Sequence, residues 1–321
     1  DASCDWSSDV CSSDLIKEES ITFAKGFEEY LDDCRGRNLR KATITHYEEV
    51  YKAVTRYIDK EMNIKDMNEL TVSKFIIECN KTNVSSQTLY TYTRDFKTIL
   101  YYFMRMDYLK HFNIKLPKLD KKAIETYSDW ELKKLLKKPD LKHCTFVEYR
   151  DWTIINFLLS TAVRLSSFTS IKIKDLDFEN EVVYINTTKN RKPLIIPLNK
   201  SIIKVLKGYL KIRQNETDDE YLFCTAYNKR LVNKSINGSL IKYNRDRGVM
   251  RTGIHRYRHT FAKKFIINGG NPVILQKILG HSSLLITENY LNILVSDIKS
   301  EMSKFDILSE FNNVHINIHK K

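Results

Sequence analysis

The sequence predicts a mainly α-helical protein with a small β-sheet, divided into two domains. A length of 321 residues corresponds to two domains at about 150 residues each. The chain contains only 9 Gly and 5 Pro, too few for a fold built from many tight turns, and 42% of its residues are hydrophobic. Apolar residues recur at helical spacing in successive stretches, and one stretch has the β-branched pattern of a hairpin.

The charge of the chain favours a polyanionic partner. The formal net charge is +13. Lys and Arg side chains that neutralise phosphates supply most of the non-specific affinity of proteins for nucleic acids. The alternative is a basic protein whose charge serves only its solubility.

The composition also indicates a cellular compartment. No run of about 18 apolar residues is present, so we expect no membrane span, and no secretory signal is recognisable. The six cysteines are scattered, without a C-x-x-C pair. We therefore expect reduced thiols in a cytoplasmic protein and no structural zinc.

The first domain is predicted to be a helical bundle over residues 16–108. It follows residues 1–15, which are rich in Ser, Asp and Cys, contain no Lys or Arg, and resemble translated adapter sequence; we expect a non-native leader there. Four amphipathic patterns succeed one another after it. The second of them has Thr43 as its candidate N-cap and repeats apolar residues at Ile44, Tyr47, Tyr51, Val54 and Ile58.

The second domain is predicted over residues 124–305. A lysine-rich segment with little periodicity, 109–123, is the expected linker, and a capping-box pattern between Ser128 and Glu131 begins the next helix. A strongly apolar helix then runs into Arg164. A hairpin is predicted from strands at 182–185 and 194–197, with Lys189 in the turn, and residues 306–321 form a polar C-terminal tail.

The last third of the chain holds three short motifs close together. His255 and Arg258 form a His-x-x-Arg pair, His281 follows a Leu-Gly pair, and Tyr290 lies nine positions later. Together they suggest a site that binds a phosphodiester and attacks it with a phenol. None of the three motifs indicates much when taken alone. Two earlier residues also have simpler interpretations: Arg164 would form an ion pair with a carboxylate, and Lys189 in the hairpin turn would be solvated.

These motifs resemble those of the tyrosine recombinase (phage integrase) family. That family has an Arg in a Thr-Gly-x-Arg context, a Lys in a hairpin turn, a His-x-x-Arg, a Leu-Gly-His and a Tyr nine residues beyond that His. This chain matches the order and spacing at Arg164, Lys189, His255, Arg258, His281 and Tyr290. The resemblance implies a helical, SAM-like core-binding domain over 16–108 and a mixed α+β catalytic domain over 124–305.

The resemblance also implies a reaction. Tyr290 would attack a DNA phosphodiester to give a 3′-phosphotyrosyl intermediate, and Lys189 would protonate the departing 5′ hydroxyl. The two arginines would clamp the non-bridging oxygens, whose negative charge grows in the transition state. His255 would act as general base or bind the phosphate, and His281 would donate a hydrogen bond to it. Neither a metal nor another cofactor is needed.

Three positions around this site call for attention. The Gly of the Thr-Gly-x-Arg motif is Ala162 here, and the acidic residue usual three positions after the Arg is Ser167. His259 lies four residues after His255, a spacing that can bind zinc on a helix. Because no Glu or Cys nearby offers a third ligand, we interpret His259 as a supporting residue.

The partners follow from the resemblance as well. We expect double-stranded DNA, a homotetramer on two duplexes with the segment 295–311 exchanged between neighbours, and accessory DNA-bending proteins. The expected function is integration or excision of a mobile element. The alternatives are a chromosome-dimer-resolving recombinase, a type IB topoisomerase-like enzyme that relaxes DNA, and a DNA-binding regulator with a decayed site.

Overall fold

The computed structural model describes residues 21–119, 125–188, 193–281, 283 and 287. The expected leader at 1–15, the tail at 306–321, Lys189 and Tyr290 lie outside the described residues. Contacts divide the chain into two compact units, Asp1–Lys122 and Ala123–Lys321, and each is described by itself. The functional domain limits given above stay predictions.

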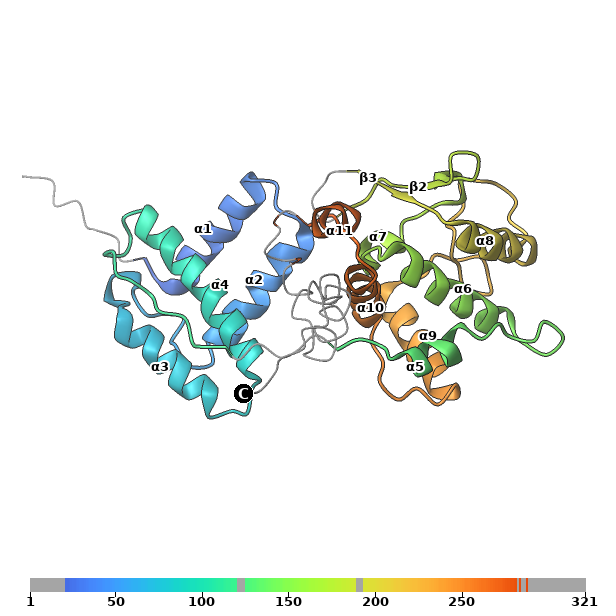
Figure 1. Cartoon of the computed structure of the whole chain (residues 1–321). Coiled ribbons are helices and arrows are strands. Elements are labelled where there is room, and N and C mark those ends of the chain that lie inside the picture. The colour runs from blue at the N-terminus through green and yellow to red at the C-terminus, as the bar shows by residue number, and fades with distance from the viewer. Residues whose placement is uncertain (1–20, 120–124, 189–192, 282, 284–286, 288–321) are drawn as a thin grey trace, which may run out of the picture. The chain divides into compact units, whose positions relative to one another are not determined.

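The described residues of the first unit, 21–119, form four α-helices and one 3-10 turn. The helix α4 contacts each of the other three, and the largest apolar side chains lie between them, fully buried. The prediction of four helical patterns is therefore confirmed, and Figure 1 shows these helices in blue to cyan. Their bounds are α1 Phe23–Gly36, α2 Lys41–Val54, η1 Ile64–Asp66, α3 Glu69–Asn80 and α4 Ser86–Arg105.

The start of α2 differs from the prediction. Thr43 is not the N-cap, because α2 begins at Lys41 after Arg40, which makes no side-chain capping bond. The backbone N–H of Thr43 donates to the carbonyl of Arg40 over 2.8 Å, so Thr43 lies inside the first turn. Asn38, with φ of +55°, ends the preceding helix and lets the new one begin earlier than the Thr.

The second unit packs its helices and a small sheet around α6. The central residues of α6 are fully buried, and α8, α9, α10 and α5 contact this helix. No helix in the described part of the chain is long and apolar enough to cross a membrane. The helices, coloured green to red in Figure 1, are α5 Asp129–Leu136, α6 Phe146–Thr161, α7 Leu165–Phe168, η2 Ile173–Asp175, α8 Lys200–Arg213, α9 Asn233–Asp246, α10 Ile254–Ile267 and α11 Pro272–Leu279.

The sheet is antiparallel, in the order β1-β2-β3. The two predicted strands are present as β2 Val182–Ile185 and β3 Leu194–Pro197, with Val183 opposite Ile196. The third strand, β1 Leu176–Asp177, has two residues and was not predicted, because such a short strand shows no alternation.

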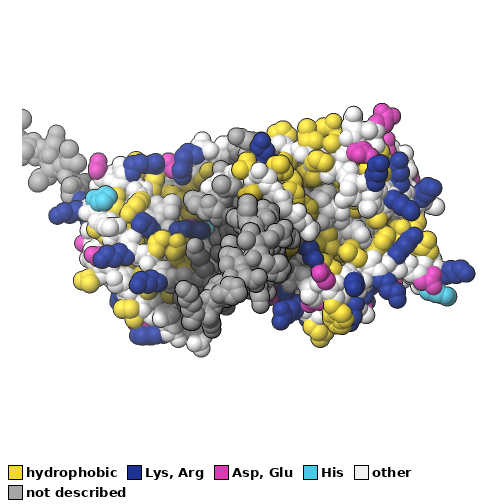
Figure 2. Space-filling view, in the orientation of Figure 1, with side chains coloured by type: hydrophobic (Ala, Val, Ile, Leu, Met, Phe, Trp, Pro, Cys, Tyr) yellow, Lys and Arg dark blue, Asp and Glu magenta, His cyan; other side chains and the backbone are white. Residues whose placement is uncertain are grey.

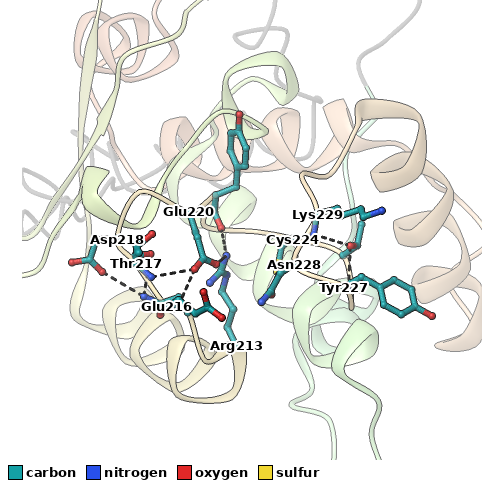
Figure 3. Close-up of polar contacts among 12 residues, drawn as sticks. Arg213, Glu216, Thr217, Asp218, Glu220, Cys224, Tyr227, Asn228 and Lys229 are labelled. Atoms are coloured by element: carbon teal, nitrogen blue, oxygen red, sulfur yellow. Dashed lines mark hydrogen bonds and ion pairs between the residues drawn. The ribbon is translucent and has the colours of Figure 1, made fainter.

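One buried arginine closes the loop that follows α8. Nη2 of Arg213 donates to Oε2 of Glu220 and to the carbonyl of Tyr221, each over 2.8 Å. The other carboxylate oxygen of Glu220 accepts the backbone N–H groups of Glu216 and Thr217 (Figure 3). These bonds hold the loop to the end of α8.

Candidate phosphodiester site

Arg164 lies at a sharp break in the chain. The apolar helix α6 ends at Thr161, and Ala162 takes the left-handed conformation, with φ of +50°. The next helix, α7, then begins after Arg164. Glycine is the residue that adopts this conformation without strain, whereas a residue with a Cβ pays roughly 1–2 kcal/mol. The Ala in place of the family's Gly therefore occupies a strained backbone position beside the arginine.

Arg258 is buried and is held by main-chain carbonyls. Only 6% of the residue is exposed. Its Nη1 donates to the carbonyl of Ala162 over 2.6 Å, and its Nη2 donates to the carbonyl of Leu279 over 2.7 Å. Both acceptors lie at helix C-terminal ends, where carbonyls lack intrahelical donors and carry partial negative charge. The guanidinium therefore joins the ends of α6 and α11.

Arg164 is anchored on the neighbouring carbonyl. Its Nη2 donates to the carbonyl of Gly280 over 3.0 Å. Gly280 has φ of +58°, and a Cβ there would meet Nη1 of Arg164 at 3.4 Å and Cδ2 of Leu194 at 3.7 Å. The two arginines thus donate to consecutive carbonyls at the C-terminal end of α11, those of Leu279 and Gly280. The first residue of β3 lies against the same turn, so the hairpin adjoins the site.

His281 completes this group in a defined tautomer. Its Nε2 lies 2.9 Å from Nη2 of Arg258, and its Nδ1 lies 2.9 Å from Oγ1 of Thr287. A guanidinium only donates, so Nε2 must accept, and Nδ1 therefore carries the proton and donates to the threonine. Desolvation, followed by the positive charges of Arg258 and Arg164, lowers the pKa of His281 to about 4. The imidazole is therefore neutral at neutral pH.

Two further histidines lie on α10. His255, in the first turn, has an exposed side chain, yet the protein around its ring removes part of its hydration. This desolvation, with the charges of Arg258 and Arg164, lowers the pKa of His255. Desolvation also lowers the pKa of His259 to about 4, and the nearby His255 and Arg258 contribute. Both rings therefore lie in a positive potential that favours their neutral, proton-accepting form.

A buried hydrogen-bond network sets the rotation of α10. The hydroxyl of Tyr257 donates to Oδ1 of Asn244 over 2.7 Å, and Nδ2 of Asn244 donates to the hydroxyl of Tyr127 over 3.0 Å. The backbone N–H of Tyr127 donates to Oγ1 of Thr260 over 2.9 Å, so the network both begins and ends on α10. Because Tyr257 is fully buried, the adjacent Arg258 is held toward the ends of α6 and α11.

The structure gathers four of the six predicted residues. Arg164 and Arg258 lie on consecutive carbonyls, His281 contacts Arg258, and the pKa of His255 responds to both arginines. Lys189 lies outside the described residues, but Thr188 before it is buried and β3 after it reaches Gly280. Tyr290, three positions after the buried Thr287, is also outside them.

Sequence reasoning missed the groups that hold these side chains. The partners of the two arginines are carbonyl oxygens, which every residue possesses and no motif marks. Thr287, fully buried, was also missed, although a polar residue within an apolar stretch is a signal for an internal hydrogen bond. At Ser167, where the family usually has an acidic residue, the buried serine keeps a backbone bond from its N–H to the carbonyl of Arg164, 2.9 Å long.

Comparison with known proteins gives an independent assignment. The model of the phage integrase family matches residues 128–296, and that of the phage integrase SAM-like domain matches residues 22–113. The chain belongs to the phage integrase family. Membership confirms the predicted family and fold class, and it places the chain among the tyrosine recombinases, which break and rejoin DNA.

Relatives within the phage integrase family are distant. Tyrosine recombinase XerA of Pyrococcus furiosus is 29% identical over 199 residues, which cover 61% of this chain and 66% of that relative, just under two thirds of its length. A tyrosine recombinase of Pseudothermotoga lettingae is 24% identical over 294 residues, covering 89% of this chain and 96% of the relative.

Solved structures of the family share the fold. The Tn1549 transposon integrase in complex with a circular intermediate DNA superposes with a TM-score of 0.72 at 21% identity, covering 89% of this chain and 100% of that one. A lambda integrase dimer bound to a COC′ core site superposes with a TM-score of 0.69 at 13% identity, covering 94% and 100%.

Proposed function

We propose that this chain is a site-specific recombinase that cleaves and rejoins double-stranded DNA through a 3′-phosphotyrosyl intermediate. The observation that carries the proposal is the convergence of Arg164, Arg258 and His281 on the turn that follows α11. Two guanidinium groups of permanent charge lie there beside a neutral imidazole. Such a pocket suits the extra negative charge of a pentavalent phosphate in its transition state.

The histidine gives this pocket a way to respond to its substrate. The neutral His281 accepts from Arg258 before a phosphate arrives. A phosphate anion in the pocket raises the pKa of a neighbouring imidazole, because it stabilises the charged form. In the proposed reaction, His281 takes up a proton as the phosphate binds, and its Nε2–H then donates to a non-bridging oxygen.

The covalent steps are assigned to the two residues outside the described part of the chain. Tyr290 attacks the phosphorus, its phenolic proton passes to His255, and Lys189 gives a proton to the departing 5′ oxygen, which leaves as a 5′ hydroxyl. A phenol has an ordinary pKa of about 10, so a base and adjacent positive charge are both needed at neutral pH. The lowered pKa of His255 leaves that imidazole free to accept the proton.

Covalent capture of the protein–DNA intermediate tests this proposal and does not require that the target sequence be known. Nicked duplexes with randomised sequence trap the intermediate, because the short strand beyond the cleaved bond diffuses away before religation. We expect protein–DNA adducts that survive denaturation with the wild-type chain and none with Tyr290→Phe. Tyr227→Phe is the matched control, because Tyr227 is a tyrosine of the same unit with 86% of its surface exposed. Adducts formed equally by Tyr290→Phe would refute the assignment of the nucleophile.

Relaxation of supercoiled DNA separates this proposal from the topoisomerase alternative. A plasmid that contains no sequence enriched among the captured duplexes should stay supercoiled in the presence of the wild-type chain. Efficient relaxation of such a plasmid would favour the type IB topoisomerase-like activity.

The biological role that we propose is integration or excision of a mobile element, with resolution of chromosome dimers as the alternative. Both roles use the same strand exchange, so the location of the DNA site decides between them. Attachment repeats and mobile-element genes beside the coding sequence are expected for the first role. A single captured site near the replication terminus of the chromosome would instead support the second. Both roles place the chain in the cytoplasm, together with the DNA.

We also propose a homotetramer on two duplexes, aided by accessory DNA-bending proteins. An apolar groove of about 440 Å³ in the second unit supports the assembly; its lining includes Leu132, Leu136, Leu159, Phe261 and Phe265. In the proposed assembly this groove takes up the segment 295–311 of a neighbouring copy, which contains the apolar residues Ile307, Leu308 and Phe311.

Light scattering on DNA carrying a captured site tests this assembly. The full chain should form tetramers on two duplexes, whereas a chain ending at Leu294 should bind DNA without pairing the duplexes. Equal pairing by the shortened chain would contradict the exchange of this segment.

A further inference from the structure

A buried carboxylate in the first unit holds two surface side chains. Asp95 on α4 is 5% exposed. Its oxygens accept from Nε of Arg94 over 2.8 Å and from Nη2 of Arg94 over 3.0 Å, and Oδ2 lies 2.7 Å from Nε2 of His46 on α2. Arg94 and His46 remain 51% and 41% exposed. The carboxylate therefore fixes two polar groups that face solvent.

The geometry of the Arg94–Asp95 pair leaves a defined edge of the guanidinium facing outward. The carboxylate occupies the Nε and Nη2 side of the fork. The guanidinium has five N–H donors in one plane, so the end formed by Nη1 and Nη2 keeps a parallel pair of donors. That pair matches the two acceptors, O6 and N7, which guanine presents in the major groove. An arginine already fixed in its rotamer loses less conformational entropy on binding.

The rest of the exposed face of α4 suits a base-pair edge. Gln87, Thr91, Arg94 and Thr98 recur at a spacing of three or four residues and lie on one side of the helix. They carry hydrogen-bonding groups and no carboxylate, and an α-helix fits the major groove of B-DNA.

The face of α1 has the opposite character. There Arg35 pairs with Asp32 and Arg37 pairs with Asp33, so carboxylates lie at the surface next to the basic groups. The positive charge of these arginines is neutralised by the neighbouring carboxylates, so this face attracts phosphates weakly. Figure 2 shows Lys and Arg side chains spread widely over the viewed face of each unit. Basic charge alone therefore does not single out one surface for DNA, whereas the α4 face has the hydrogen-bonding groups needed for base recognition.

We infer that Arg94, positioned by Asp95, recognises a guanine of the target DNA through its major-groove edge. This rests on the proposed DNA-binding function. Arg94 is then a specificity-determining residue, and Asp95 acts through it. His46 contacts Oδ2 of the same carboxylate and so ties α2 to this arrangement.

Selection of bound duplexes from a random-sequence library tests this inference without a known target. The wild-type chain should enrich a sequence that contains a G·C pair at one position. Arg94→Lys keeps the charge and removes the fork, so it should lower the preference for that pair by roughly 5- to 150-fold and leave other positions unchanged. Asp95→Asn should weaken the same position although Arg94 is present, with thermal unfolding as the check of its fold. Arg35→Lys, on the acidic face, is the matched control.

The other outcomes are distinguishable. An unchanged sequence profile for Arg94→Lys would overturn the inference. If Arg94 contacts a phosphate instead, Arg94→Ala should weaken binding to all sequences equally and reduce the slope of log affinity against log salt concentration by about one. If the wild-type chain enriches no sequence, the site-specific function itself fails, and the role of Arg94 fails with it.

Discussion

Arg258→Lys separates the structural role of the buried guanidinium from its proposed catalytic role. The substitution keeps the positive charge but replaces a planar fork by a single ammonium. Arg258 serves three acceptors from two nitrogens: the carbonyls of Ala162 and Leu279, and Nε2 of His281. One ammonium at a position that is 6% exposed cannot reach all three.

The expected loss of stability follows from these contacts. A buried acceptor left without a partner costs about 1–3 kcal/mol, so losing two of the three costs roughly 2–6 kcal/mol. Arg164→Lys is the matched comparison, because Arg164 is only partly buried and water can reach the carbonyl of Gly280 that it binds. We expect it to cost less than about 1.5 kcal/mol. Both variants should lose about 100- to 1,000-fold in the rate of DNA cleavage.

Two measurements on each variant test this difference. Urea unfolding gives the free energy of unfolding, and single-turnover adduct formation on nicked duplexes gives the cleavage rate under conditions where both variants are folded. Equal losses of stability in the two variants, or a loss below about 1 kcal/mol for Arg258→Lys, would refute the role of the carbonyl contacts. Cleavage by either variant at the wild-type rate would refute the clamp on the phosphate.

Three further predictions concern local groups. His281 and His259, with pKa values lowered to about 4, bind fewer protons when folded than when unfolded at the ordinary pKa of about 6.5. The free energy of unfolding should therefore fall as the pH drops from 6.5 toward 4, by about 1–2 kcal/mol for each histidine after allowance for solvent screening. Urea midpoints that do not change over this range would argue against it. So would a dependence of stability on pH that stays the same when both histidines are replaced by Gln. Thr287→Val should slow DNA cleavage about tenfold by removing the acceptor for Nδ1–H of His281, whereas Thr287→Ser should retain the rate; a slow Ser variant would point to packing instead. Gln214→Gly should raise the free energy of unfolding by about 0.5–1 kcal/mol, because Gln214 ends α8 with φ of +53°. Ala162→Gly should raise it by less, because that change also removes a buried methyl group. Calorimetry on both variants checks this order.

Local sequence was sufficient for most of the secondary structure. The capping box between Ser128 and Glu131 begins α5, as predicted, and Asn271 followed by Pro272 begins α11. These signals succeed because a cap and an amphipathic stripe act over a few neighbouring residues. Prediction failed at Thr43, where the competing start at Arg40 depends on how the chain leaves α1.

The motif order determined which side chains form the candidate site, since charge and hydrogen-bonding capacity belong to the residue type. Arg164 and Arg258 could be named from the sequence for this reason. Only the tertiary structure showed that their partners are the carbonyls of Ala162, Leu279 and Gly280, and that Arg94 shares a buried carboxylate with a histidine from another helix. Main-chain acceptors are present at every residue, and contacts between distant segments form only when helices pack, so neither leaves a signature in the sequence.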